Sequence, residues 1–221
     1  MRRFTPALLA GLLAGLAALT GCGPLGPAPE AKFVPLQPLE SADAEKLAKR
    51  AMLPADVLSE FSMGEPDTTT RDETVMWGGC STSLPSDQFK ARAVQLSWEE
   101  PYAGHAGYVY TAKGSNVITE IRQMVDNDCR KRRAADRDGA FTEEITLPAQ
   151  TGITQYAYCT TERYVGQENV YYWHNCQVYM ARELRGASVV TTFALVSEDL
   201  EKAKTFIGRV SGRMAEQLRK A

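Results

Sequence analysis

Strand-like patterns fill much of the chain after residue 74, where β-branched and aromatic residues gather in short runs separated by turn formers. The last run alternates most clearly, since it places Val189, Thr191, Phe193 and Leu195 on one face. Consecutive runs joined by short turns predict neighbouring antiparallel strands. The expected strands cover residues 74–80, 90–99, 105–112, 141–148, 153–165, 169–185 and 187–196.

Apolar residues recur at helical spacing in two longer segments, residues 115–133 and 197–221. The apolar face of the first segment places Cys129 among the residues that should be buried. That face consists of Val117 or Ile118, Ile121, Val125 and Cys129. The second segment begins with Ser197 as the expected N-cap. Its apolar stripe consists of Leu200, Ala203, Ile207, Val210, Met214 and Leu218.

Two shorter helices are expected before the first strand. Ser41 is placed to cap a helix over residues 41–50, and Pro54 suits the first turn of a helix over residues 54–63. The two longer helices each have one apolar face to bury on the sheet. The sequence therefore predicts one α+β domain over residues 41–221, with a central antiparallel sheet packed by two main amphipathic helices.

The amino terminus has the layout of an export signal, with a basic start, an apolar run and no acidic residue until Glu30. The sequence LTGC that ends at Cys22 resembles the bacterial lipobox, in which the chain is cut before the cysteine and the thiol is diacylated. We therefore expect residues 1–21 to be a signal peptide and Cys22 to be the lipidated first residue of the mature protein. Two acyl chains would hold it on the extracytoplasmic face of a bacterial cell membrane. The alternative is an ordinary cleaved signal followed by a chance cysteine.

Residues 22–40 form a proline-rich tether, since they hold five of the eleven prolines and show no helical or strand periodicity. Removing residues 1–21 takes away two arginines and no acidic residue, so the formal charge changes from −2 to −4. A slightly acidic chain does not favour a nucleic-acid partner. The expected partners are the membrane, through the lipid anchor, and an unknown small ligand or envelope protein.

Four cysteines remain once Cys22 is assigned to lipid, and disulfides persist in an exported chain. They are Cys80, Cys129, Cys159 and Cys176, which allow two bridges in three connectivities, and the spacing does not choose among them. A zinc site of four thiolates is the competing interpretation, but no C-x-x-C spacing is present. We therefore expect no metal and no cofactor.

Sequence motifs give no indication of catalysis, because the chain has no G-x-S-x-G elbow, P-loop or H-E-x-x-H. The only histidines, His105 and His174, have no partner at metal-ligand spacing and are interpreted as structural. The carboxylates of Glu143 and Glu144 alternate sides if they lie on a strand, so only one of them could face a given site. We expect a protein that is not an enzyme.

Aromatic side chains are concentrated in the expected strands over residues 153–165 and 169–185. Alternation puts Tyr171, Trp173 and Tyr179 on one face, and Tyr172 and His174 on the other. Core packing is the simpler interpretation of this set. A groove lined by part of it is the functional one, since tyrosine combines apolar area with a hydrogen-bonding group. The candidate ligand-binding residues are Tyr108, Tyr110, Tyr172 and His174.

The order of elements and cysteines resembles one known family. It runs from the LPADVLSEF helix start and the strand ending in WGGC, through the helix that carries Cys129, to Cys159, Cys176, the ASVVTTFALV strand and the closing helix. Over residues 50–221 this order is similar to the extracytoplasmic sensor-domain family of the mycobacterial membrane protein kinase H, which includes many actinobacterial lipoproteins. The resemblance implies an α+β body, a cleft for an unknown ligand, and the bridges Cys80–Cys129 and Cys159–Cys176. The chain departs from the family pattern in having no kinase domain and a longer span between Cys129 and Cys159.

The turn count agrees with the second of these bridges. Seven positions separate Gly166 from Cys159, and seven separate Asn169 from Cys176, so a turn over residues 166–169 brings the two cysteines opposite each other.

We expect a lipid-anchored extracytoplasmic sensor or small-ligand-binding domain. The alternative is a structural or protein-interaction lipoprotein of the cell envelope. An envelope hydrolase is disfavoured because no nucleophile is paired with a base. An apolar pocket with a volume on the order of several hundred Å³ would favour the first function, and a flat exposed apolar patch without a pocket would favour the second.

Overall fold

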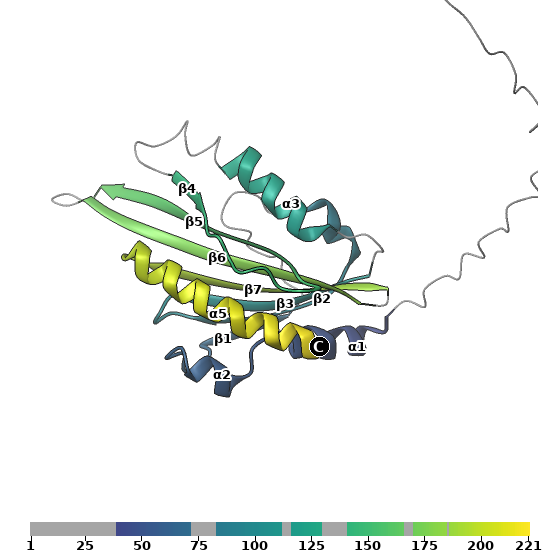
Figure 1. The fold of residues 1–221 in the computed structure, drawn as a ribbon. Coiled ribbons are helices and arrows are strands. Elements are labelled where there is room, and N and C mark those ends of the chain that lie inside the picture. The colour runs from purple at the N-terminus through teal and green to yellow at the C-terminus, as the bar shows by residue number, and fades with distance from the viewer. Residues whose placement is uncertain (1–38, 72–82, 112–115, 130–140, 166–169, 185) are drawn as a thin grey trace, which may run out of the picture. The chain divides into compact units, whose positions relative to one another are not determined.

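Seven strands form one antiparallel sheet in the described part of the chain, in the order β1-β2-β3-β7-β6-β5-β4 (Figure 1). The computed structural model describes residues 39–71, 83–111, 116–129, 141–165, 170–184 and 186–221. The strands are β1 Thr68–Arg71, β2 Lys90–Trp98, β3 Ala103–Tyr110, β4 Phe141–Glu144, β5 Thr154–Val165, β6 Val170–Leu184 and β7 Ala187–Ser197. The α+β class and the antiparallel sheet predicted from the sequence are thus confirmed.

Helices cover both faces of the sheet. Helices α1 and α5 lie against one face, which we call the α5 face, and α3 lies against the other, which we call the α3 face (Figure 1). The helices are α1 Ser41–Ala51, α2 Ala55–Ser59, α3 Val117–Met124 and α5 Leu200–Lys220, with a 3₁₀ turn η1 at Pro85–Phe89 and a π-helical turn η2 at Val125–Cys129. The two longer predicted helices therefore pack on opposite faces.

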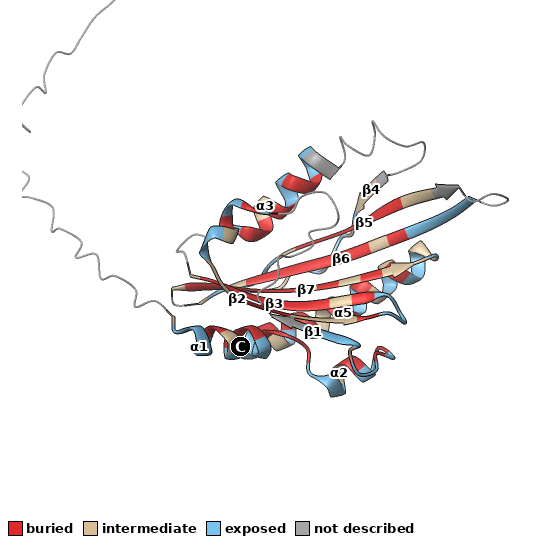
Figure 2. Cartoon of the chain, turned by 180° about the vertical axis from the view of Figure 1, so that it is seen from behind, coloured by how far each residue is buried: buried red, intermediate tan, exposed pale blue. Residues whose placement is uncertain are grey.

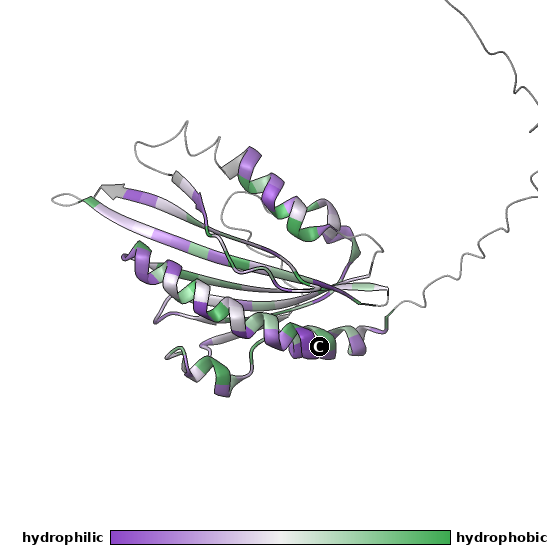
Figure 3. Cartoon of the chain, in the orientation of Figure 1, coloured by the Kyte–Doolittle hydropathy of each residue, from purple (hydrophilic) through white to green (hydrophobic). Residues whose placement is uncertain are grey.

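The α5 face carries the larger core. Helix α5 buries an apolar stripe that matches the predicted periodicity, except that Leu200 is only partly buried. Hydrophobic and hydrophilic residues alternate along this helix (Figure 3). The buried residues of α5 are Ala203, Ile207, Val210, Ser211, Met214, Ala215 and Leu218. They pack on strand residues of the same face, among them the buried Val189, Phe193 and Leu195 of β7.

Helix α1 adds to this core more than the sequence suggested. It buries Ala44, Leu47, Ala48 and Ala51, so the prediction of two main packing helices was too simple. Gly107 on β3 explains the close approach, because a Cβ at that position would overlap the carbonyl oxygen of Ala48. Glycine is required here for space and not for a special backbone conformation.

The α3 face has a smaller core rich in tyrosine. Helix α3 buries Val117, Ile118, Ile121 and Met124 over this face. The ring of Tyr158 stacks on Tyr156 and Tyr179, with centroids 5.5 and 6.2 Å away. The strand residues in this core are Ala93, Ala106, Tyr108, Tyr110, Tyr156, Tyr158, Tyr179, Ala181 and Val190.

Strands β5 and β6 form a long hairpin that extends beyond its neighbours (Figure 2). Cys159 pairs with Cys176 in this hairpin, and a disulfide joins them, as the resemblance implied and the turn count suggested. Among the described strands, β7 reaches β6 only as far as His174, and β4 reaches β5 only as far as Thr161. The remaining pairs, Glu162–Val165 with Val170–Trp173, form a ribbon that is two-stranded within the described residues.

Helix boundaries differ from the predictions at the caps. The N-cap of α5 is Asp199, whose Oδ1 accepts a hydrogen bond from the backbone N–H of Lys202 at 3.0 Å. The prediction of Ser197 was wrong because Ser197 is still the last residue of β7, and its Oγ accepts from the N–H of Asp199. Ser41 is likewise the first residue of α1 and not its cap, which is Glu40.

Other predictions differ in extent or lie outside the described residues. Helix α3 ends at Met124 and passes into the π-helical turn, so the regular helix is shorter than expected. Strand β1 was missed because its TTTR sequence has no apolar alternation. Cys22, the signal peptide, the strand over residues 74–80 with Cys80, and the side chain of Cys129 all lie outside what the structure describes.

Candidate ligand groove

A groove runs across the α3 face beside the area that α3 packs against. The floor of the groove has little side-chain volume in its middle, because the cross-strand register pairs two small residues there, Gly104 of β3 and Ala194 of β7. The same row continues to Ser97 on β2 and to Gln177 on β6. Polar side chains thus stand on either side of a floor that has almost no side-chain volume. The groove has a volume of about 300 Å³.

The walls of the groove consist mainly of amides and hydroxyls. Gln95 and Ser97 come from β2, while Asn175 and Gln177 come from β6. Residues two apart on a strand point to the same face, which explains how each strand supplies a pair. Amide side chains each offer donors and an acceptor, so this surface suits a ligand with neutral polar groups. The remaining lining residues are Thr68, Trp98, Glu99, Tyr102, Ala103 and Val196.

Gln177 is the best fixed of the wall residues. Its side-chain oxygen accepts a hydrogen bond from the Tyr179 phenol, and a longer one of 3.5 Å from the Tyr158 phenol. Its Nε2 donates to Oδ1 of Asn175 at 3.0 Å. Burial raises the pKa of Tyr179 well above its usual range, so this phenol remains a donor at neutral pH. The network therefore holds the Gln177 and Asn175 amides in a defined orientation.

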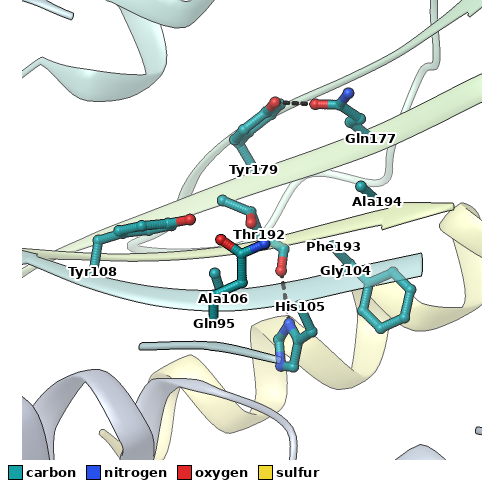
Figure 4. A pocket seen from close by; sticks show the side chains of 10 residues that line it. All are labelled: Gln95, Gly104, His105, Ala106, Tyr108, Gln177, Tyr179, Thr192, Phe193 and Ala194. Atoms are coloured by element: carbon teal, nitrogen blue, oxygen red, sulfur yellow. Dashed lines mark hydrogen bonds between the residues drawn. The ribbon is translucent and has the colours of Figure 1, made fainter. Parts of the chain in front are cut away.

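A small cavity of about 50 Å³ closes the inner end of the groove. Tyr108, Tyr179 and Thr192 line it together with Gln95 and Gln177, which also line the groove. In Figure 4 the ring of Tyr179 and the amide of Gln177 lie on one side of the strands, and the imidazole of His105 lies on the other. This end is roomy enough for a water-sized group and not for a ring.

The outer end opens into a hollow of about 260 Å³ flanked by two aromatic side chains. Tyr102, in the β2–β3 connection, is 62% exposed, and Trp173 on β6 is 40% exposed. Glu162 pairs with Trp173 across β5 and β6 and lines the same hollow. Tyr102, Asn175 and Val196 line both the hollow and the groove, so the two form one continuous depression.

Charge around the depression is negative. The charged residues that line the groove and the hollow in the described part of the chain are Glu99 and Glu162, and no described lysine or arginine lines either space. Arg122 lies elsewhere on the α3 face, where it covers the Tyr156 ring at 4.5 Å and pairs with Glu144 at 3.0 Å. The described lining thus offers an anionic ligand no cationic side chain.

The four residues predicted to bind a ligand do not form one site. Tyr108 and Tyr110 lie on the α3 face, where both are buried in the tyrosine core and only Tyr108 borders the small cavity. Tyr172 and His174 occupy the opposite face, because they alternate with Trp173 and Asn175 on β6. Tyr172 is exposed, whereas His174 is buried and contacts Oγ1 of Thr161 through Nδ1 at 2.9 Å.

His105 has a structural role on the α5 face. The backbone N–H of Leu53 donates to its Nε2 at 2.7 Å, and its Nδ1 donates to the carbonyl oxygen of Thr192 at 2.6 Å. Burial lowers the pKa of His105 to about 4, so the imidazole is neutral under ordinary conditions. Both ring nitrogens are occupied, which leaves no atom for work in the groove.

Sequence reasoning missed the wall residues of the groove. Gln95 and Ser97 on one strand, and Asn175 and Gln177 on another, are polar residues at a spacing of two. Such a pair within a predicted strand is a usable indication of a polar site on one face of the sheet. The density of aromatic residues, on which the sequence prediction of a site was based, does not reveal this spacing.

No model of a protein family matches this chain, and no curated protein matches it. Within the described ranges, no three His, Cys, Asp or Glu residues come together as a metal site would require. No helix in the described part of the chain combines the length and the apolar character needed to cross a membrane.

Proposed function

We propose that this chain is a lipid-anchored extracytoplasmic domain that binds a small ligand, as a sensor or binding protein, without catalysing a reaction. The observation that carries the proposal is the groove of about 300 Å³ on the α3 face, with a floor of Gly104 and Ala194 and with amide walls, of which Gln177 and Asn175 are held by hydrogen bonds. This volume is at the lower end of the range for small-molecule sites. The polar lining differs from the apolar pocket that the sequence hypothesis had named as its support.

The chemistry of the lining supports binding more than catalysis. The wall residues Gln95, Ser97, Asn175 and Gln177 have no ionisable group, and such residues orient a ligand without moving protons. The imidazoles of His105 and His174 face the opposite side of the sheet. A nucleophile paired with a base would be expected of an acyl-transfer site.

A substitution that fills the floor tests the binding function. A Cβ on Gly104 would meet Leu96 O at 3.8 Å, which is ordinary contact, so Gly104→Leu should fold while its side chain occupies the groove. Ligands found by native mass spectrometry or by a thermal-shift screen of the wild type should be lost in Gly104→Leu. Gly104→Ala is the matched control and should retain them. A ligand that binds Gly104→Leu as tightly as the wild type would place the binding function elsewhere.

The lipid anchor and the sensor-domain resemblance are parts of the same proposal. Support comes from the LTGC sequence at Cys22, the proline-rich tether and the order of the elements. The mass of the mature protein from the membrane fraction should correspond to a chain that begins at an acylated Cys22, and Cys22→Ala should release or stall it. An unmodified amino terminus at another residue would contradict the anchor and leave the groove unaffected.

One observation favours the alternative of a protein-interaction lipoprotein. The first four residues of β6 are exposed and are apolar or aromatic. They are Val170, Tyr171, Tyr172 and Trp173. Such a stretch can serve as a contact for a partner protein. If it does, Tyr172→Ser, on the face away from the groove, should abolish a crosslinked complex in intact cells and leave small-molecule binding unchanged.

A further inference from the structure

We propose that the ligand is a small organic cation, whose ammonium group occupies the hollow between Tyr102 and Trp173 and whose neutral polar part extends along the amide walls. The inference rests on the proposed binding function and adds the chemical class of the ligand. It is drawn from three properties of the depression: its two exposed rings, its carboxylates and its amide walls.

The exposed rings provide the first step. Tyr102 and Trp173 line one hollow although they come from distant parts of the chain, the β2–β3 connection and β6. Large exposed aromatic side chains lose contact with water when a ligand covers them. The faces of Trp and Tyr attract cations through the ring quadrupole, and quaternary ammonium groups are commonly bound in this way.

Charge provides the second step. Glu162 is the cross-strand partner of Trp173 and lines the same hollow, and Glu99 lines the adjoining groove. Among the residues that the structure describes, neither of these spaces has a lysine or arginine in its lining. A carboxylate beside an aromatic pair favours a cation and disfavours a phosphate or carboxylate ligand. The carboxylates and the aromatic rings of the site thus both favour a positively charged ligand.

The amide walls provide the third step. The hollow passes into the groove through Asn175, which accepts a hydrogen bond from Gln177 and belongs to both spaces. A ligand held by an ammonium group at Trp173 would therefore extend over the Gly104 and Ala194 floor, between Gln95 and Gln177. Hydroxyl or amide groups on that part of the ligand would find both donors and acceptors.

A pair of isosteres tests the positive charge. The full chain, in a nonionic polyoxyethylene detergent, is titrated with choline and with 3,3-dimethylbutan-1-ol, which has the same shape without the charge. Calorimetry, together with the NMR signal of the Trp173 indole N–H, reports binding. We expect choline to bind at least about tenfold more tightly than its neutral isostere. Its affinity should fall as salt is raised, because exposed charges are screened.

Variants locate the effect. Trp173→Leu and Tyr102→Leu should each weaken choline binding about fivefold or more, the loss expected for one cation–π contact. Tyr102→Phe, which keeps the ring, should recover most of the choline affinity that Tyr102→Leu loses. Glu162→Gln should weaken binding and reduce its dependence on salt. Tyr172→Ser is the control for a neighbouring exposed aromatic residue on the other face and should have no effect.

The outcomes separate this inference from the proposed function. Equal affinity for choline and its neutral isostere would overturn the inference that the ligand is a cation. Binding of glucose or acetate without binding of choline would overturn it as well. In either case the groove remains a binding site if Gly104→Leu blocks the ligand that does bind. Choline binding that Trp173→Leu and Glu162→Gln do not change also overturns the inference. If no probe binds and the wild-type screen finds no ligand blocked by Gly104→Leu, both proposals fail.

Discussion

The backbone N–H of Leu53 donates a hydrogen bond to Nε2 of His105, at 2.7 Å, and thereby joins the α1–α2 connection to the middle of the sheet. The acceptor exists only while the imidazole is neutral, because a protonated ring would carry a hydrogen on both nitrogens. Leu53 and His105 are both buried, so water does not replace a lost bond. Docking of α1 and α2 is thus coupled to the protonation state of one histidine.

The first prediction concerns acid stability. Because the pKa of His105 is lowered from 6.5 to about 4, the unfolded chain takes up a proton between these pH values and the folded chain does not. As the pH is lowered through this window, the free energy of unfolding should therefore fall by about 1.4 kcal/mol per pH unit, or about 3 kcal/mol in all. Above pH 6.5 the contribution of His105 to the free energy of unfolding should not change with pH.

Urea unfolding at several pH values checks this contribution. His105→Gln should lose that part of the acid sensitivity while the carboxylates and His174 contribute equally in both proteins. If His105→Gln is too unstable to compare, an NMR titration of the wild-type His105 ring gives the same answer. A ring that titrates near pH 6.5 in the folded protein would contradict the prediction.

Two glycines on β3 should respond oppositely to alanine. Gly107→Ala should destabilise the protein by about 1–3 kcal/mol, because the new methyl group would overlap the Ala48 carbonyl and lie 2.9 Å from Cγ of Met52. Gly104→Ala should change stability by about 0.5 kcal/mol or less, because its nearest neighbour is 3.8 Å away. Thermal or urea unfolding compares the two variants. Equal losses would show that α1 does not approach the sheet as described.

Replacing Gln177 by leucine should cost about 1–3 kcal/mol, because an acceptor for the buried Tyr179 and Tyr158 phenols is removed. Adding Tyr179→Phe to Gln177→Leu should recover part of the loss, since the phenol that needs the acceptor is then absent. Stability measurements on the two single variants and the double variant form the test. Strict additivity would mean that the two side chains do not interact.

The Cys159–Cys176 bridge closes a loop with a sequence separation of 17. Replacing both cysteines by alanine should lower the free energy of unfolding by about 3 kcal/mol on the chain-entropy model. In the native wild type the bridge should resist mild reductants, because both cysteines are fully buried. Rapid reduction without unfolding would contradict that burial.

Peptide mapping without reduction tests the remaining pair. Because Cys159 and Cys176 are bonded, the resemblance predicts a peptide that joins Cys80 to Cys129. Free thiols at both positions, or a bond from either one to Cys22, would contradict the predicted framework and weaken the family resemblance.

Much of the fold could be predicted from the sequence, because alternation in the strands and the stripe of α5 are direct results of burial on one side. The opposite directions of Glu143 and Glu144 are a clear case, since the first pairs with Lys204 of α5 and the second with Arg122 of α3. The pairing of Cys159 with Cys176 followed from a turn of known length. The prediction of Ser197 as the N-cap of α5 was wrong because strand and helix signals overlap at this residue.

The groove could not be predicted in the same way. It depends on which strands are neighbours, and β3 lies beside β7, about 85 residues away in the sequence. Only this pairing places Gly104 beside Ala194 and puts the polar pairs of β2 and β6 on either side. Tyr108 and His174 looked equivalent in the sequence because aromatic density does not reveal which face of the sheet each residue occupies.

The two-stranded ribbon, where β5 ends and β6 begins, should open more easily than the rest of the sheet. Residues Val170–Trp173 are hydrogen-bonded to one described neighbour, so their amides should exchange with solvent through local fraying. Fraying should stop near the covalent link between Cys159 and Cys176. We therefore expect Trp173 to lie in a weakly protected segment of the depression, and Gln177, just beyond the link, to lie in a better protected one. A bound ligand that contacts both would slow hydrogen exchange in the ribbon far more than in the walls.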